Sequence, residues 1–371
     1  MNEPSTYVGL DAHKSAIVAA VLLPGEREPH QWKIVNEPQA VRRFGKKLRR
    51  LAPGPIRSCY EAGPCGYVLQ RQLRALDIEC AVIAPSLIPV KPGQHLKTDH
   101  RDARKLAELL RAGLLTDVEP PSESEEAVRD LCRARDDAQR DLTRARNRLG
   151  KFLLRRGRVY VVGRKPTWSQ KYRVWLRGLT FEQHADQIIF ENYLLTVEQV
   201  EARLEALDRE LDAVSTTEPY RVPVGALRCF RGIDTVTALA LVAELHRPER
   251  FPGARQLMAF LGLVPREASS GDRRRQGAIT GAGNRHLRRL LIEAAWHYRH
   301  KPVPGPKLRQ RRRGQPPHVI ALADQALRRL TLRQRRMLYA GKHPNTVNVA
   351  VARELVGYIW RVLRGLQPAQ A

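Results

Sequence analysis

The sequence predicts an α/β domain with a mixed sheet, followed by a helical coiled-coil region and a mainly α-helical C-terminal domain. Short apolar runs alternate with amphipathic helical stretches up to about residue 120, which is typical of an α/β domain. Pro120 and Pro121 then precede a stretch of heptad-spaced apolar residues. Beyond about residue 218, apolar residues recur at helical spacing. We therefore expect domains at 1–120, 121–217 and 218–371.

The first region is expected to hold three strands, after which helices alternate with strands. Two apolar runs joined by a tight polar turn are typical of a β-hairpin. Each later apolar run is followed by an acid or by a loop, which is typical of the end of a strand. The resulting order, β-β-β-α-β-α-β-α, predicts a mixed sheet with helices on its faces. Strands are expected at Tyr7–Asp11, Ala16–Leu23, Gln31–Val35, Ile56–Glu61 and Glu79–Ala84, and helices at Gln39–Leu51, Pro64–Leu76 and Lys97–Leu110.

Two heptad seams characterise the second region. Ser122 or Ser124 is placed to cap the first of these helices, and Arg135 is its one imperfect seam position. An antiparallel helical hairpin, an oligomer-forming coiled coil and ordinary helices of one bundle all fit this pattern. The seams are Val128, Leu131, Arg135, Ala138, Leu142, Ala145, Leu149 and Phe152, and then Val197, Val200, Leu204, Leu207, Leu211 and Val214.

The third region is expected to be helical, with one long loop and one linker. A helix, a tight turn at Gly232 and a second helix are expected within Leu227–Leu245. The segment Val264–Gly283 is rich in Gly, Ser and Arg and is expected to be a loop, and Lys301–Pro317 a basic linker. Further helices are expected at Phe251–Leu263, Asn284–Arg299, Val319–Tyr339 and Thr346–Leu366.

The charge balance points to a polyanionic partner. Lys and Arg total 65 against 38 Asp and Glu, a formal net charge of +27 in 371 residues. Nucleic acid is the natural partner for such an excess, and no apolar run is long enough to cross a bilayer. The first residues lack the apolar core of a signal peptide, and the five cysteines show no metal-binding spacing. We therefore expect reduced thiols and a cytoplasmic protein.

Four acids could form a metal site. Asp11 and Glu61 end predicted strands, and ligands gather at the carboxyl ends of strands in α/β sheets. Asp99 and Asp102 lie three residues apart at a helix start, so they share a helix face. Such a pair alone is also typical of a charged first turn. Together, the four acids favour Mg²⁺ or Mn²⁺, and paired ions about 3.5–4 Å apart serve phosphodiester chemistry.

Basic side chains accompany each candidate site. Ser269 and Ser270 precede Gly271 among arginines that could clamp a phosphate, although an isolated SSG is also typical of a solvated turn. A glycine turn before a helix can bind a backbone phosphate, and this applies at Gly232 and at Gly281–Gly283. The candidate phosphate contacts are Lys97, Arg101 and Arg104 beside the acids, Arg266, Arg273, Arg274 and Arg275 beside the serines, and Arg285, Arg288 and Arg289 after the second turn.

Six segments together resemble the IS110/IS1111 family of DEDD transposases. They are GLDAHK at 9–14, CYEAGPCGY at 59–67, KTDHRDARKLAELL at 97–110, RGIDTVTALALVAEL at 231–245, FLGLVPREASSG at 260–271 and GNRHLRRLLIEAA at 283–295. The resemblance implies a RuvC-like, ribonuclease H-type fold for the first domain. It also implies that Asp11, Glu61, Asp99 and Asp102 form the magnesium-binding quartet and that Ser270 is the nucleophile.

The same resemblance implies a site-specific recombinase acting in the bacterial cytoplasm at the nucleoid. Such an enzyme excises its element as a circle and inserts it into double-stranded donor and target DNA. A structured non-coding guide RNA from the element's own end directs it. The family assembles as homodimers and homotetramers, in which the acidic quartet of one subunit meets the serine of another.

Three other functions remain open from the residues. A RuvC-like nuclease would use a metal-activated water in place of Ser270. A non-catalytic RNA-binding scaffold would tolerate replacement of Asp11 or Asp102. A sugar-kinase or acetate-kinase fold also begins with a GxD strand, but it needs glycine-rich phosphate loops in both halves, and residues 120–215 are predicted to be helical instead.

Overall fold

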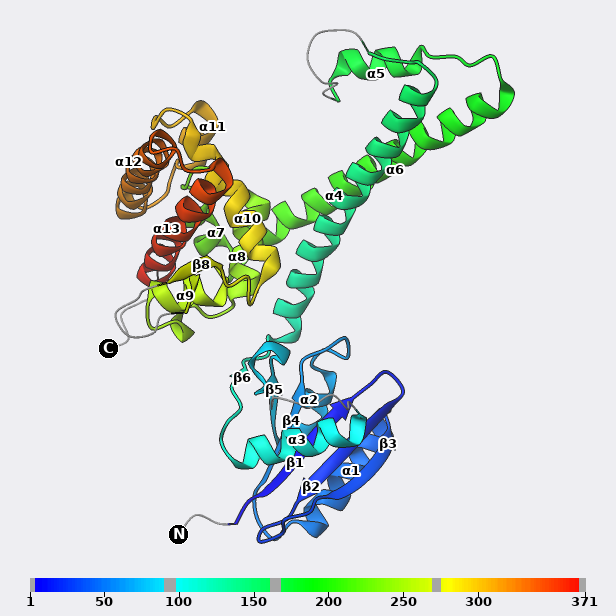
Figure 1. Cartoon of the computed structure of the whole chain (residues 1–371), viewed down its shortest axis with the longest axis vertical. Coiled ribbons are helices and arrows are strands. Elements are labelled where there is room, and N and C mark those ends of the chain that lie inside the picture. Colours follow the sequence, from blue (N-terminus) through cyan, green and yellow to red (C-terminus); the bar gives the residue numbers. More distant parts are fainter. Residues whose placement is uncertain (1–3, 90–97, 161–167, 269–274, 367–371) are drawn as a thin grey trace. The chain divides into compact units, whose positions relative to one another are not determined.

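The computed structural model describes residues 4–89, 98–160, 168–268 and 275–366. The chain forms two compact units, Met1–Pro121 and Ser122–Ala371, which are described separately below (Figure 1). The first unit contains the predicted mixed sheet, and the second is mainly helical, as expected.

A six-stranded sheet forms the centre of the first unit. Its middle strand β1 (Thr6–Ala12) is antiparallel to β2 (Ala16–Leu22), which in turn is antiparallel to β3 (His30–Val35). On the other side, β4 (Ile56–Glu61) and β5 (Glu79–Ile83) continue the sheet in parallel with β1. The antiparallel edge strand β6 (Asp117–Val118) was not predicted, because two residues carry no periodic signal.

Three helices cover the two faces of this sheet (Figure 1). Helix α1 (Pro38–Leu51) and helix α2 (Val68–Arg74) pack on one face, and α3 (Asp99–Arg111) packs on the other. The prediction of helix from Pro64 was wrong, since residues 63–67 form turns and Gly66 has a φ of 60°, outside the helical range. A short 3₁₀ helix, Pro85–Leu87, follows β5.

Gly9 sets how closely α3 approaches the sheet. It lies in the middle of β1, and a Cβ atom built on it would be 2.1 Å from the Ala103 carbonyl oxygen and 2.4 Å from the Ala107 amide nitrogen. Both atoms belong to the backbone of α3, so no side-chain rotation relieves the overlap. A glycine is therefore required where this helix crosses β1.

Gly9→Ala is expected to destabilise the first unit by about 1–3 kcal/mol or more, because α3 must move away from the sheet. Urea unfolding followed by circular dichroism measures this loss. Gly63→Ala is the matched control, since the atom nearest to a Cβ built on Gly63 is 3.9 Å away. Equal stability of the two variants would contradict the close contact between α3 and β1.

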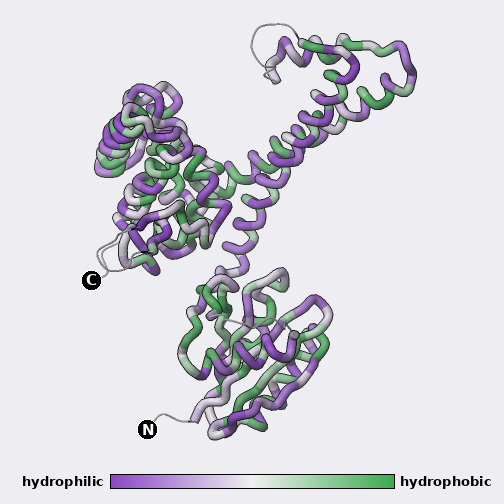
Figure 2. Tube along the Cα trace, viewed as in Figure 1, coloured by the Kyte–Doolittle hydropathy of each residue, from purple (hydrophilic) through white to green (hydrophobic). Residues whose placement is uncertain are grey.

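An antiparallel helix pair begins the second unit. Helix α4 (Glu123–Arg155) starts at Ser122, whose side chain forms a capping box with Glu125, and α6 (His184–Ser215) packs along it. Figure 2 shows α4 as mostly hydrophilic with short hydrophobic stretches between, and those stretches supply the seam. The short α5 (Gln170–Arg177) lies between the two helices in sequence. Three ion pairs join α4 to α6, and the residue number rises along α4 while the partner's falls along α6, as expected for antiparallel helices. They are Arg135–Asp208 at 2.8 Å, Arg146–Glu201 at 2.6 Å and Arg156–Asp186 at 2.6 Å.

The remaining helices share one apolar core. A turn at Gly232, with φ of 81°, precedes α8 (Thr235–Leu245), as the sequence predicted. The helix expected between Leu227 and this turn was misplaced, since α7 (Arg221–Leu227) ends at Leu227. Two expectations were wrong: the predicted loop contains a hairpin of β7 (Pro265–Glu267) and β8 (Gln276–Ile279), and the predicted linker contains α11 (Pro306–Arg311). The other helices are α9 (Ala254–Phe260), α10 (Arg285–Trp296), α12 (Pro317–Tyr339) and α13 (Pro344–Gly365), with 3₁₀ turns at Pro248–Arg250 and His297–Arg299.

None of the helices among the described residues is both long enough and apolar enough to cross a membrane.

Candidate active site

Asp11 and Glu61 lie side by side at the ends of two neighbouring parallel strands. Leu10 of β1 pairs with Tyr60 of β4, so the next residue on each strand is one of the two acids. Side chains two residues apart on a strand share a face, so Asp11 lies on the face of Gly9, which α3 covers. Glu61 likewise lies on the face of Cys59, whose thiol contacts the Leu106 carbonyl of α3. The register thus puts both acids on the α3 side of the sheet.

The start of α3 supplies the other two acids. Thr98 caps the helix by accepting a hydrogen bond from the Arg101 amide, and Asp99 and Asp102 fall in the first turn. The carboxylates of Asp99 and Asp102 both lie close enough to affect the titration of Asp11. The structure therefore brings three of the four predicted acids together, with Glu61 exposed on the adjacent strand.

His13 joins this cluster and was missed by the sequence reasoning. Its Nε2 lies 3.2 Å from Asp11 Oδ2 and 3.5 Å from Asp99 Oδ1. Among the described residues, Asp11, His13 and Asp99 offer ligand atoms that all lie within 4.8 Å of one another. His13 directly follows β1, which ends at Ala12, and its two-residue spacing from Asp11 was the one local signal in the sequence.

The electrostatics of the cluster favour a bound cation. Burial raises the pKa of the Asp11 carboxyl above its ordinary value, and the charges of Asp99 and Asp102 raise it further, while His13 opposes the shift. Carboxylates that repel one another are stabilised by a divalent cation between them. Carboxylate oxygens suit Mg²⁺ or Mn²⁺, so the acids present fit such an ion.

The basic residues around α3 differ in their surroundings. Arg101 is exposed on the first turn, next to the acids. The guanidinium of Arg104 forms ion pairs with Glu28 at 2.6 Å and Glu108 at 2.7 Å, so intramolecular carboxylates already hold it. Lys97 lies outside the described residues.

The strands β7 and β8 hold the two ends of the serine segment. Ser269, Ser270, Arg273 and Arg274 lie outside the described residues. On either side of them, the Ala268 amide donates a hydrogen bond to the Arg275 carbonyl at 2.9 Å. This hydrogen bond joins the two described residues that flank the serine segment in sequence. Arg266, on β7, donates to the Thr280 carbonyl at 3.3 Å and is exposed.

The arginines of α10 have mainly structural contacts. The guanidinium of Arg288 donates to the carbonyls of Leu261, at 2.9 Å, and Ala282, at 2.7 Å. Arg289 forms ion pairs with Asp136 and Glu293, and Arg285 is exposed on the first turn of the helix. Of these three candidate phosphate contacts, Arg285 is the most exposed, and the Arg289 side chain is 41% exposed.

Both helix starts proposed as phosphate sites already carry a side-chain cap. The Asp234 carboxylate accepts a hydrogen bond from the Thr237 amide at 2.9 Å at the start of α8. The Asn284 side chain accepts one from the Leu287 amide at 2.9 Å at the start of α10. The negative charge of Asp234 also disfavours an anion at the first position.

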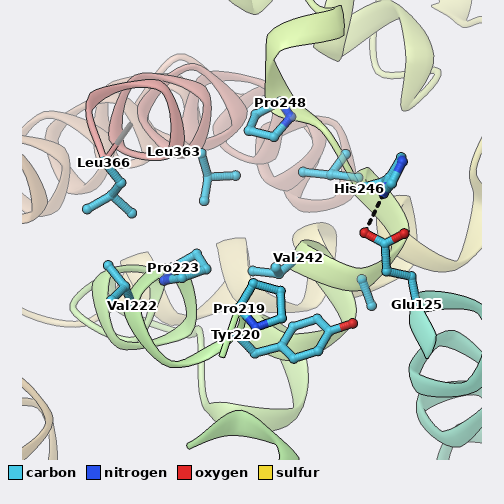
Figure 3. A pocket seen from close by; sticks show the side chains of 12 residues that line it. Glu125, Pro219, Tyr220, Val222, Pro223, Val242, His246, Pro248, Leu363 and Leu366 are labelled. Atoms are coloured by element: carbon cyan, nitrogen blue, oxygen red, sulfur yellow. Dashed lines mark hydrogen bonds and ion pairs between the residues drawn. The ribbon is translucent and has the colours of Figure 1, made fainter. Parts of the chain in front are cut away.

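The second unit also contains a cavity of about 360 Å³, whose lining residues are different from these candidates (Figure 3). Apolar side chains line most of it, and Leu363 and Leu366 lie opposite Val222 and Pro223 in the view. At one end, His246 Nδ1 lies 2.7 Å from Glu125 Oε1. Since Glu125 also completes the capping box of α4, this pair ties the end of α8 to the start of α4.

Comparison with known protein families gives matches over both units. Residues 8–156 match a model of the IS110-type DEDD transposases, described as transposase. Residues 225–310 match the model described as transposase IS116/IS110/IS902 family. The first match contains all four acids, and the second contains the serine segment.

Curated relatives extend the similarity along most of the chain. A putative transposase, y4qE, of Sinorhizobium fredii is 39% identical over 96% of this chain and 88% of its own length. The transposase for insertion sequence element IS1533 of Leptospira borgpetersenii is 36% identical over 87% of this chain and 94% of its own. The transposase for element IS1111A of Coxiella burnetii is 27% identical over 61% of each.

Proposed function

Because the chain belongs to the IS116/IS110/IS902 family of transposases, we propose that it excises and inserts an insertion-sequence element through a phosphoserine intermediate. Its substrates are double-stranded donor and target DNA, and a structured non-coding RNA encoded by the element guides it. Residues 1–120 act as the RuvC-like catalytic domain, 121–217 as the coiled-coil region and 218–371 as the domain carrying the serine. Homodimers and homotetramers are the expected assemblies.

The single observation that supports this proposal best is the convergence of the acids. The register of β1 and β4 and the first turn of α3 bring Asp11, Asp99 and Asp102 together, with Glu61 on the next strand. These carboxylates would hold Mg²⁺ or Mn²⁺. When bound, the ion supplies Lewis-acid stabilisation of the charge that develops on a phosphoryl group.

Strand exchange needs no external energy source in this scheme. The Ser270 Oγ forms a bond to phosphorus while one phosphorus–oxygen bond of the DNA backbone breaks. The serine gives up its proton, and the departing deoxyribose oxygen gains one. A hydroxyl of a second strand then attacks the phosphoserine and restores the serine, so the number of phosphodiester bonds is unchanged.

The charge of the chain supports a partner set of RNA and DNA. A net charge of +27 suits a protein that neutralises many phosphates. Its binding to nucleic acid should therefore weaken steeply as the salt concentration rises. The DNA sequence would be recognised by base pairing with the RNA, and the protein would contact the backbone and shape of the nucleic acids.

Expression of the reading frame with its natural flanking DNA tests the proposal. We expect a circular form of the element, detected by amplification across its joined ends, and a discrete non-coding RNA that co-purifies with the protein. Circles formed without any co-purifying RNA would contradict the proposal that an RNA guides the enzyme. Linear breaks without joined ends would instead indicate a nuclease.

A further inference from the structure

A stripe of basic and exposed apolar residues runs along one face of α12. Arg329, Leu332, Arg336 and Tyr339 follow one another at three- and four-residue steps, so they share one face of the helix. Leu332 is 51% exposed and Tyr339 is 98% exposed. The opposite face is buried in the core of the second unit, through residues such as Leu330. The outer face of α12 therefore presents an aromatic ring and an aliphatic side chain among arginines.

The charge around this stripe is almost entirely positive. No Asp or Glu occurs between Gln325 and Arg353, and Glu354 ends the acid-free stretch by pairing with Arg329 and Arg333. The cations of this stretch lie on α12, at Lys342 just after it, and at Arg353 on α13. The full set in this stretch is Arg328, Arg329, Arg333, Arg335, Arg336, Lys342 and Arg353.

A hollow lies on the same face, about one turn before Tyr339. Its volume is about 370 Å³. Guanidinium groups and apolar side chains line it together, a combination that suits a phosphate beside a sugar or base. The lining residues are Arg329, Leu332, Arg333, Arg336, Met337 and Glu354.

We propose that this α12 stripe binds an unpaired segment of a structured RNA, with a phosphate beside Arg336 and a base stacked on Tyr339. Base stacking on exposed aromatic rings among cations is how single strands are held, whereas the bases of a duplex are already stacked and paired. A second copy of this chain is disfavoured, because two such basic faces repel. The inference rests on the RNA partner of the proposed function and adds the surface that meets it.

The test uses full-length protein and a short oligouridylate that contains 4-thiouridine. We expect the photo-crosslinked peptide to contain Tyr339. Tyr339→Ala should weaken binding about tenfold, and Tyr339→Phe, which keeps the ring, should bind like the wild type. Leu338→Ala is the matched control, since it removes a neighbouring exposed side chain outside the stripe. Arg336→Gln should reduce the slope of log affinity against log salt by about 0.7.

Each other outcome overturns the inference. Equal binding by Tyr339→Ala and Leu338→Ala would exclude stacking on Tyr339. A loss on Tyr339→Ala that is as large for duplex DNA would assign the stripe to DNA, and an altered oligomeric mass with unchanged RNA binding would assign it to a second copy. The assay requires no strand exchange, so a protein that forms no serine adduct can still pass it, and the failure of one proposal does not imply failure of the other.

Discussion

Asp11→Asn is expected to abolish strand exchange while leaving the first unit folded. Asp11 lies at the centre of the acid cluster, in contact with His13 and close to Asp99 and Asp102. An amide in its place keeps the shape but removes the charge that holds a cation. Loss of the cation's charge stabilisation is worth several kcal/mol, or on the order of a thousandfold in rate. Asp102→Ala is expected to have an effect of the same kind.

The joined-strand product measures activity, and Mn²⁺ binding measured by electron paramagnetic resonance reports on the site itself. Glu79→Gln, an exposed acid at the other end of the sheet, where β5 begins, is the matched control. Full strand exchange by Asp11→Asn would remove the cluster from the mechanism. That result would also favour a purely structural role, in which Asp99 and Asp102 only stabilise the start of α3.

The pH dependence of this site follows from the raised pKa of Asp11. Because burial and neighbouring carboxylates raise that pKa, the folded protein holds the Asp11 proton more tightly than the unfolded chain does. Without a cation, this group's contribution to stability is therefore greatest at low pH and is lost as pH rises through the raised pKa. The proton also competes with the cation, so Mn²⁺ binding should weaken at a higher pH than for an ordinary carboxylate. Asp11→Asn removes both dependences.

The sheet and the acids could be predicted because local patterns specify them. Apolar runs ending in acids located Asp11 and Glu61, and the order of elements predicted the mixed sheet. The two-residue spacing of Asp11 and His13 also lay in the sequence, but a histidine in a turn offers no sign of which carboxylates it will meet. The position of Asp99 over Asp11 depends on the packing of α3, and the lack of a Cβ at Gly9 permits that packing.

Contacts between residues distant in sequence could not be predicted. Arg104 was expected beside a phosphate, but its partner Glu28 lies on a loop 76 residues earlier. Arg135 interrupts its heptad seam because it meets Asp208 of α6, a pairing that no local pattern shows. The β7–β8 hairpin was missed because its strands are short and polar, so tertiary pairing outweighs weak local propensity. Such long-range partners separate structural arginines from those that remain free to meet a ligand.

Ser270→Ala is expected to abolish the covalent protein–DNA adduct completely, because no other atom of that side chain can attack phosphorus. The adduct is trapped by denaturing the reaction and is detected as labelled DNA that migrates with the protein. Strand joining should disappear with it, since the phosphoserine stores the bond that the second strand receives. The fold should be unaffected, because the substitution removes only one hydroxyl group.

Ser269→Ala is the matched control, because it removes a hydroxyl one residue away on the same short connection. We expect it to keep the adduct, whereas a reversed result would move the nucleophile to Ser269. If both variants form no adduct but cleave DNA at the wild-type rate, the enzyme is a RuvC-like nuclease that uses water. The acid cluster alone fits either chemistry, since Mg²⁺ can activate a water or a serine hydroxyl equally well. The serine variants therefore decide between recombination and hydrolysis, while the Asp11 variant decides only whether the cluster is catalytic.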